Sequence, residues 1–176
     1  MAIECMVDIE ALGDGLLVQV GMVAFDTGDW APLEGLTVNI DPLTCKGRPS
    51  TETVLWWLQQ SPEAIAGVFD PDGRVPLSEG LRLANAFYRG SRCQAMWSHA
   101  TYDSVVLSRH YEEAGFAPAW GRKGVRDLRT LFSLVPEGVV AGAYRSAGHG
   151  LIDHVAQDDC VKQIRVLGAA MRALGR

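Results

Sequence analysis

Three apolar, β-branched runs fill the first forty residues, and short turns separate them. The runs cover residues 3–10, 16–25 and 36–40, with turn residues at 13–15 and 26–29. Parallel neighbours would need a long crossover between strands, which these turns cannot provide. The N-terminal region is therefore predicted to form an antiparallel three-strand meander.

Beyond residue 42 the pattern changes to helices interrupted by a short strand. Ser50 or Thr51, and then Ser61 followed by proline, are typical of helix N-termini. The spacing of apolar residues predicts helices over 78–89, 102–114, 127–134 and 154–174, a strand over 94–98, and a flexible loop with four glycines over 136–150. Residues 1–176 are therefore predicted to form one α/β domain around a mixed central sheet.

Composition indicates the class of protein. The chain has 176 residues, of which 48% are hydrophobic and 21% charged, as in an ordinary globular protein. Its N-terminus lacks the basic region of a signal peptide, and no window approaches the roughly 18 apolar residues of a membrane span. The four cysteines form neither a zinc-binding nor a disulfide pattern. We therefore expect a soluble cytoplasmic protein with free thiols and no membrane partner.

Two acids, Asp8 and Glu10, interrupt the otherwise apolar first run. Side chains alternate across a strand, so both carboxylates point to one face while Val7 and Ile9 point to the other. Bare carboxylates at this spacing repel each other, and a divalent cation would supply the missing counter-charge. Oxygen ligands suit Mg²⁺ or Mn²⁺ better than zinc. The alternative is an edge strand with solvated acids, and this motif alone does not decide between them.

Three later residues extend the acidic set: Asp103, His154 and Asp159. Asp103 starts a predicted helix directly after a short buried strand, although a first-turn acid favoured by the helix dipole is the alternative. His154 and Asp159 lie about 140° apart around a helix, so both can border one cleft. A histidine in such a cleft is suited to removing a proton from water near neutral pH, and a surface histidine at a helix end is the alternative.

Taken together, these five residues resemble the DEDDh branch of the DnaQ-like 3′–5′ exonucleases, which have an RNase H-like fold. The chain looks like the small exonuclease family that includes mycobacterial 3′–5′ exoribonuclease-like proteins and phage exonucleases. The resemblance is carried by segments from residue 6 to residue 159: MVDIEALG, VGMVAFD, TVLWWLQQS, WSHATYDSVVL, VRDLRTLF and HVAQDD. It implies a mixed central sheet with the three-strand meander and flanking helices.

The resemblance also implies a metal-dependent hydrolase that removes nucleoside 5′-monophosphates from the 3′ ends of RNA or single-stranded DNA. His154 would act as general base, and a homodimer is a further expectation. Two divalent metal ions, Mg²⁺ or Mn²⁺, would be held by Asp8, Glu10, Asp103 and Asp159. Two alternatives remain, namely a non-catalytic nucleic-acid-binding or adaptor domain and a phosphodiesterase for very short oligonucleotides.

Residues expected to contact the substrate are Ala11, Leu12 and Trp57. Ala11 stands where the family often has threonine, so only backbone contacts from Ala11 and Leu12 are expected there. Trp56 and Trp57 point about 100° apart on a helix, so one is expected to pack inside while the other borders the cleft and stacks on a base. Two partly buried aromatics that hold down a short helix are the alternative. The spacing from His154 selects Asp159 as the ligand and leaves Asp158 as a surface acid.

The formal net charge of −5 argues, taken alone, against a general nucleic-acid coat protein. Two divalent ions would offset four of these charges and bring the total to about −1. Affinity is therefore expected to depend on metal and on the 3′ end rather than on a broad basic surface. Arg126 and Arg129 flank Asp127 and are candidates either for phosphate contacts or for an ion pair with Asp127.

Overall fold

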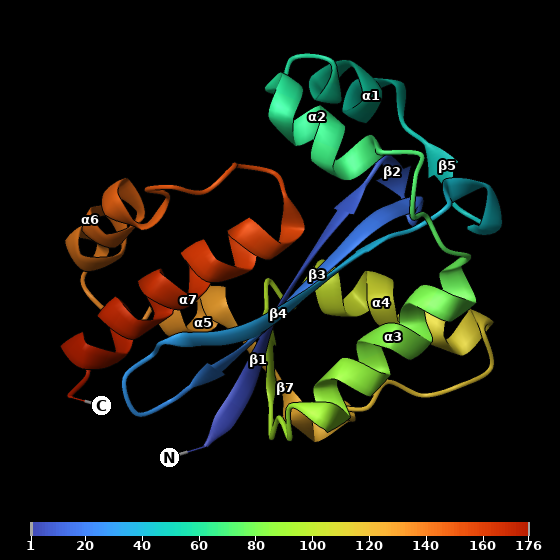
Figure 1. Ribbon diagram of the computed structural model, residues 1–176. Coiled ribbons are helices and arrows are strands. Elements are labelled where there is room, and N and C mark those ends of the chain that lie inside the picture. Colours follow the sequence, from blue (N-terminus) through green and yellow to red (C-terminus); the bar gives the residue numbers. More distant parts are fainter. Residues whose placement is uncertain (1, 176) are drawn as a thin grey trace.

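The computed structural model describes residues 2–175, and its centre is a five-stranded sheet with the order β4-β3-β1-β6-β7 (Figure 1). β1 pairs antiparallel with β3, and β3 pairs antiparallel with β4. β6 is parallel to both of its neighbours, β1 and β7. The mixed central sheet predicted from the sequence is therefore confirmed. The strands are β1 (Ile3–Ala11), β3 (Leu17–Asp26), β4 (Pro32–Asn39), β6 (Met96–Ser98) and β7 (Val125–Asp127).

β1 is the middle strand and sends alternate side chains into two separate cores. Cys5, Val7 and Ile9 pack with α3 and α4, whereas Met6 packs with α5 and α7. Figure 1 shows these two pairs of helices on opposite faces of the sheet. The first acidic strand is thus an interior strand, and the interpretation of an edge strand with solvated acids is wrong. The helices are α3 (Leu77–Gly90), α4 (Asp103–Glu113), α5 (Leu128–Phe132) and α7 (Ala156–Ala173).

Two short helices lie near the carboxyl end of β1, beside a small second sheet (Figure 1). Both begin where the sequence predicts, because the hydroxyls of Ser50 and Ser61 accept hydrogen bonds from the backbone N–H groups of Thr53 and Ala64. These elements are α1 (Thr51–Trp57), α2 (Pro62–Phe69), β2 (Gly13–Asp14) and β5 (Arg48–Pro49), and two 3₁₀ turns cover Pro42–Thr44 and Arg122–Gly124.

The predicted flexible loop over residues 136–150 is wrong, because most of this segment is helix α6 (Glu137–Ala147). Two of its four glycines lie inside the helix, and the other two lie beyond its end. Tyr144 of α6 packs edge-on against Phe132 of α5, with ring centroids 6.2 Å apart. Packing of this helix against its neighbours therefore outweighs the weak helix propensity of glycine.

Helix α7 begins at Ala156, two residues later than predicted, and His154 lies outside it. His154 has a φ of 66°, in the left-handed region that residues other than glycine rarely adopt. A residue in this conformation cannot form part of a right-handed helix. The loop between α6 and α7, and not the helix itself, therefore carries the histidine.

Within residues 2–175, no helix combines the length and the apolar composition that crossing a membrane requires. The four cysteines are free thiols, of which Cys5 and Cys160 are buried and Cys45 and Cys93 are partly exposed.

Candidate active site

Asp8 and Glu10 lie toward the carboxyl end of β1, on the face that α7 covers. Asp8 is only 9% exposed, and Glu10 is partly buried. Their sequence neighbours Val7 and Ile9 belong to the core on the other face of the sheet. The period of two in a strand therefore places both carboxylates on one face, as the sequence predicts.

Gly21 lets α7 approach this face closely. It is the cross-strand partner of Asp8 on β3, and a Cβ atom at position 21 would lie 2.2 Å from the carbonyl carbon of Ala156. The buried side chain of Gln19 holds the same end of the helix, since its Oε1 accepts a hydrogen bond from the Ala156 N–H at 2.8 Å. The first turn of α7, which contains Asp159, therefore lies directly on the sheet beside Asp8.

Asp103 is the first residue of α4 and follows β6, the parallel neighbour of β1. Parallel strands have their carboxyl ends at the same edge of a sheet, so α4 begins beside the end of β1. Asp103 is 4% exposed, and its Oδ2 accepts a hydrogen bond from the His99 N–H at 2.9 Å. This burial distinguishes Asp103 from a solvated acid in the first turn of a helix.

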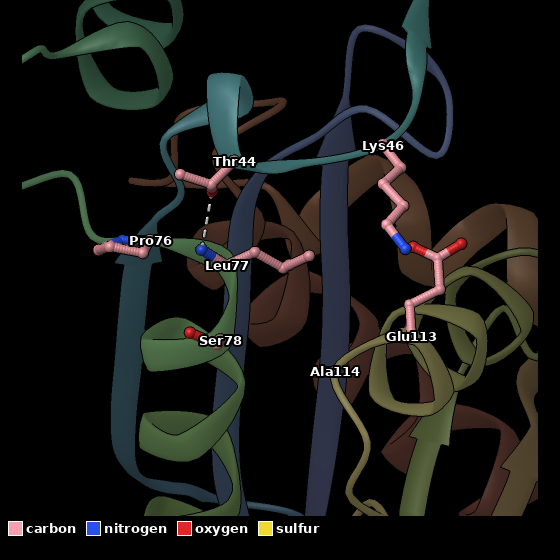
Figure 2. A pocket seen from close by; sticks show the side chains of 7 residues that line it. All are labelled: Thr44, Lys46, Pro76, Leu77, Ser78, Glu113 and Ala114. Atoms are coloured by element: carbon pink, nitrogen blue, oxygen red, sulfur yellow. Dashed lines mark hydrogen bonds between the residues drawn. The ribbon is translucent and has the colours of Figure 1, made fainter.

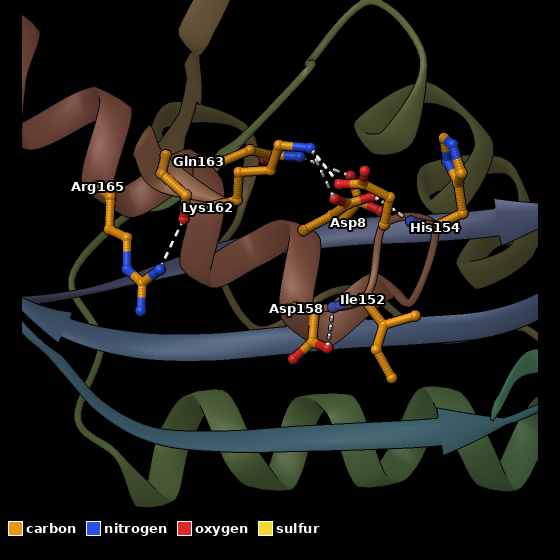
Figure 3. A network of polar contacts seen from close by, with 10 residues as sticks. Asp8, Ile152, His154, Asp158, Lys162, Gln163 and Arg165 are labelled. Carbon is orange, nitrogen blue, oxygen red and sulfur yellow. Dashed lines mark hydrogen bonds and ion pairs between the residues drawn. The ribbon is translucent and has the colours of Figure 1, made fainter. Parts of the chain in front are cut away.

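Glu10, His154 and Asp159 come together on the more open side of the site, where their potential ligand atoms all lie within 4.8 Å of one another. The backbone N–H of His154 donates a hydrogen bond to Oδ2 of Asp159 at 3.1 Å. Asp158 points elsewhere and accepts a hydrogen bond from the Ile152 N–H at 2.9 Å (Figure 3). The structure thus places Asp159, and not Asp158, beside Glu10 and the histidine.

Burial raises the pKa of all four carboxyl groups. It raises the pKa of Asp8 well above its ordinary value, with further contributions from Asp103 and Glu10. Burial, together with the charges of Asp159 and Asp103, raises the pKa of Glu10 to about 9. Burial raises the pKa of Asp103 to about 7, and it also raises the pKa of Asp159, where the charge of Lys162 opposes it. The cations near these acids therefore do not offset the cost of burying them.

Two α7 side chains that the sequence analysis missed point toward these acids (Figure 3). Gln163, which is 5% exposed, donates a hydrogen bond from Nε2 to Oδ1 of Asp8 at 2.7 Å. Its Oε1 is buried and has no hydrogen-bond partner within residues 2–175. Nζ of Lys162 lies 3.8 Å from Oδ1 of Asp159. Gln163 follows Asp159 by four residues, and residues at this spacing lie on one face of a helix. This spacing could have identified Gln163 as a neighbour of the acids from the sequence.

The two adjacent tryptophans separate into one buried and one exposed ring. Trp57 is 3% exposed, and its Nε1–H donates a hydrogen bond to the carbonyl of Ala11 at 3.2 Å. A ring buried in this way cannot stack on a substrate base, so the choice of Trp57 needs correction. Trp56 is 40% exposed, and its ring centroid lies 4.7 Å from that of His154. Of the two rings, the exposed Trp56 is therefore the one that is accessible beside His154.

The backbone expected to contact the nucleotide is engaged within the protein. The N–H of Leu12 donates to the carbonyl of Leu16 at 2.9 Å, and the carbonyl of Leu12 accepts from the N–H of Ser50 at 2.8 Å. The carbonyl of Ala11 already accepts the Trp57 hydrogen bond. Ala11 and Leu12 thus join β1 to α1, and the Leu12 N–H is not free for a substrate.

The two candidate arginines make contacts within the fold. Arg126 pairs with the buried carboxylate of Glu4 at 2.6 Å, and not with Asp127. Arg129 donates a hydrogen bond from Nη1 to Oγ1 of Thr101 at 3.2 Å. The ion pair expected with Asp127 is therefore absent from residues 2–175, and Arg126 has a structural partner.

A separate pocket of about 170 Å³ lies between the 3₁₀ turn at Pro42–Thr44, the start of α3 and the end of α4 (Figure 2). The hydroxyl of Thr44 accepts a hydrogen bond from the N–H of Leu77, the first residue of α3, at 2.9 Å. None of the acids described above lines this pocket. It is distinct from the acidic site.

A mixed sheet with four carboxylates and a histidine gathered beside the carboxyl end of its central strand defines an enzyme class, the DEDDh-type 3′–5′ exonucleases. The order of the five residues along the chain is also that of this class. The chain belongs to the Rv2179c-like 3′–5′ exoribonuclease domain family, whose model matches residues 3–171.

Known proteins agree with this assignment. The exodeoxyribonuclease of Enterobacteria phage T4 is 20% identical over an alignment of 202 residues, gaps included. The alignment covers 96% of this chain and 89% of the phage protein. A structure of exonuclease I superposes with a TM-score of 0.72 at 16% identity and covers the whole chain, which spans 42% of exonuclease I. The nuclease domain of 3′hExo, a DEDDh family member bound to rAMP, gives a TM-score of 0.65 at 13% identity, with 97% and 92% of the two chains covered. These structural likenesses confirm the RNase H-like fold.

Proposed function

We propose that this protein hydrolyses phosphodiester bonds at the 3′ ends of RNA or single-stranded DNA by a two-metal-ion mechanism and releases nucleoside 5′-monophosphates. The observation that carries the proposal is the convergence of four carboxylates and one histidine beside the end of β1. Burying like charges together is unfavourable for folding. A purely structural role therefore does not account for this cluster.

The donor set fits divalent cations that prefer oxygen ligands. The residues that would hold two Mg²⁺ or Mn²⁺ ions are Asp8, Glu10, Asp103 and Asp159. Their raised pKa values are those of buried acids with too little positive charge nearby, and such ions would supply it. When bound, the ions lower the pKa of an attacking water and stabilise negative charge on the leaving oxygen.

The protein's own residues supply proton transfer and substrate orientation. The imidazole of His154 lies close to the carboxylates of Glu10 and Asp159, where it can accept a proton from the attacking water. A pocket of about 420 Å³ opens beside this histidine and is lined in part by Gln60 and Ser61. A 3′-terminal base that stacks on Trp56 would hold the last phosphodiester next to the carboxylates. Stacking of this kind requires an unpaired 3′ end.

Both polymers remain proposed substrates. The family description names exoribonuclease activity, whereas the phage T4 relative is an exodeoxyribonuclease. The family resemblance also supports a homodimer, which size-exclusion chromatography with light scattering would test. The free thiols favour a reducing compartment such as the cytoplasm.

The test is a time course on matched 5′-labelled RNA and DNA oligonucleotides, with Mg²⁺, with Mn²⁺ and with EDTA. We expect stepwise shortening that requires metal and disappears in Asp8→Ala and Asp159→Ala. His154→Ala should lower turnover by about 10²–10⁴-fold and leave metal binding intact. Asp72→Ala, at an exposed turn position, is the matched control and should retain full activity.

Three results would contradict the proposal. Binding of either polymer without shortening in any metal would indicate a non-catalytic binding domain. Loss of metal affinity in His154→Ala would show that the histidine is a ligand rather than a base. Shortening confined to oligonucleotides of a few residues would instead identify a phosphodiesterase for very short substrates.

A further inference from the structure

The His154 loop, residues 148–155, connects α6 to α7 and determines where the imidazole lies. His154 has a left-handed backbone conformation that is sparsely populated for a residue with a side chain. A strained conformation persists only when surrounding contacts fix it. The contacts that hold this loop therefore bear directly on the position of the general base.

Three side chains of α7 hold the loop at successive points. Oδ2 of Asp158 accepts a hydrogen bond from the Ile152 N–H at 2.9 Å. Nζ of Lys162 contacts Oδ1 of Asp153 at 2.5 Å. Asp158, Lys162 and Arg165 are spaced at i, i+4 and i+7, so they leave the helix on one side, and Figure 3 labels all three on α7.

Arg165 acts at the other end of the same loop. Its Nη1 donates to the carbonyl of Ala147 at 2.6 Å and to the carbonyl of His149 at 3.2 Å. Ala147 is the last residue of α6, so this guanidinium joins the end of α6 and the start of the loop to α7. The loop is thus tied at its beginning by Arg165 and near its end by Asp158 and Lys162.

We propose that Asp158, Lys162 and Arg165 are positioning residues, which hold the His154 loop so that its imidazole faces Glu10 and Asp159. This inference rests on the proposed exonuclease function. It gives Asp158 a role distinct from that of the adjacent Asp159. Successive residues of a helix differ by about 100° in direction, so Asp159 faces the acids while Asp158 faces the loop. Asp158 acts through a backbone N–H, and its charge is not required for this.

The decisive comparison is Asp158→Ala with Asp158→Asn. Alanine removes the acceptor for the Ile152 N–H, whereas the amide oxygen of asparagine keeps it. We expect Asp158→Ala to lower kcat on a 5′-labelled single strand by about tenfold, because small displacements of a catalytic group reduce turnover strongly. KM and the Mg²⁺ concentration for half-maximal rate should stay unchanged. Asp158→Asn should restore most of the lost rate.

A second measurement asks whether Asp158 acts through the histidine. In the His154→Ala background, Asp158→Ala should cause almost no further loss, because the group that it positions is absent. Asp70→Ala is the matched control, since Oδ1 of Asp70 accepts the Asp72 N–H at 2.9 Å in a turn outside the site. Its rate should equal that of the wild type. Arg165→Ala provides an independent variant with the same expected signature, and thermal unfolding confirms that each variant is folded.

Three outcomes would overturn the inference. Equal losses in Asp158→Ala and Asp158→Asn, with a raised Mg²⁺ requirement, would make Asp158 a metal ligand. A full tenfold loss in the His154→Ala background would show that Asp158 does not act through His154. Wild-type rates in both Asp158→Ala and Arg165→Ala would show that the loop needs neither contact. A wild-type protein that fails to shorten RNA or DNA would instead refute the proposed function itself.

Discussion

Replacing Gly21 by alanine should damage the active site without touching any catalytic side chain. The new Cβ would lie 2.2 Å from the carbonyl carbon of Ala156, 2.4 Å from the N atom of Gln157 and 2.5 Å from the carbonyl oxygen of Ala156. All three atoms are backbone, so no rotamer change relieves the overlap. Ordinary contact begins at 3.4 Å, so the start of α7 must move away from β3 by about 1.2 Å.

This displacement fixes the size of the expected effects. Overpacking of this kind costs about 1–3 kcal/mol, which lowers Tm by about 2–12 °C in a chain of this length. Asp159 lies three residues from Ala156, and the His154 loop enters the helix at the same point. A shift of about 1 Å at a catalytic group can reduce turnover about 100-fold. We therefore expect the loss of exonuclease activity to exceed what the loss of stability explains.

The assay combines thermal unfolding with the 3′-shortening time course at a temperature well below both Tm values. Gly138→Ala is the matched control, because a Cβ at that position in α6 meets no atom within 4 Å. It should stabilise the protein by about 0.5–1 kcal/mol and leave turnover unchanged. If Gly21→Ala keeps its Tm and its turnover within a factor of two, the close approach of α7 does not position Asp159.

Three further substitutions test separate features of the site. The pKa of Glu10 is raised to about 9, so its contribution to the stability of the metal-free protein is fully present below pH 4.5 and is lost as pH rises toward 9. Glu10→Gln should therefore stabilise the EDTA-treated protein on the order of 2–4 kcal/mol at pH 8 and little at pH 5. Equal Tm shifts at both pH values would contradict this, and Glu112→Gln on the exposed face of α4 is the control. Gln163→Leu removes the hydrogen bond to Asp8 and should weaken Mg²⁺ activation about 10–100-fold in a metal titration, whereas unchanged activation would show that Asp8 needs no orientation. Trp56→Ala should raise KM for a single strand at least fivefold with little change in kcat, because about 1–3 kcal/mol of stacking is lost. Leu58→Ala is the control and should leave KM unchanged.

The parts of the site that lie on regular elements could be predicted from the sequence. Asp8 and Glu10 share a face because the strand period is two, and this holds wherever the strand sits in the sheet. Asp103 follows a short apolar strand and begins a helix, which places it at the edge of a parallel sheet. Local periodicity was sufficient for these three acids.

The parts that depend on packing between elements could not be predicted. The spacing of apolar residues predicts a helix that begins at His154, but contacts with α7 hold this residue in a left-handed conformation. Strand β7 has only three residues, too few to show a period, and pairing with β6 defines it. Trp56 and Trp57 are equivalent in sequence terms, and only the position of α1 against β1 decides which ring is buried.

Net charge also depends on burial, which the sequence does not report. The formal value of −5 counts every acid as ionised. The pKa of Glu10 is raised to about 9 and that of Asp103 to about 7, so the metal-free site carries fewer negative charges at neutral pH than this count assigns. Divalent cations must then displace protons from these acids when they bind, and their affinity increases with pH until the acids are ionised. Under the proposed function, attraction for a nucleic acid 3′ end would be governed by the protonation and metal occupancy of a few buried acids, and the sum of charges over the chain would be a poor guide to it.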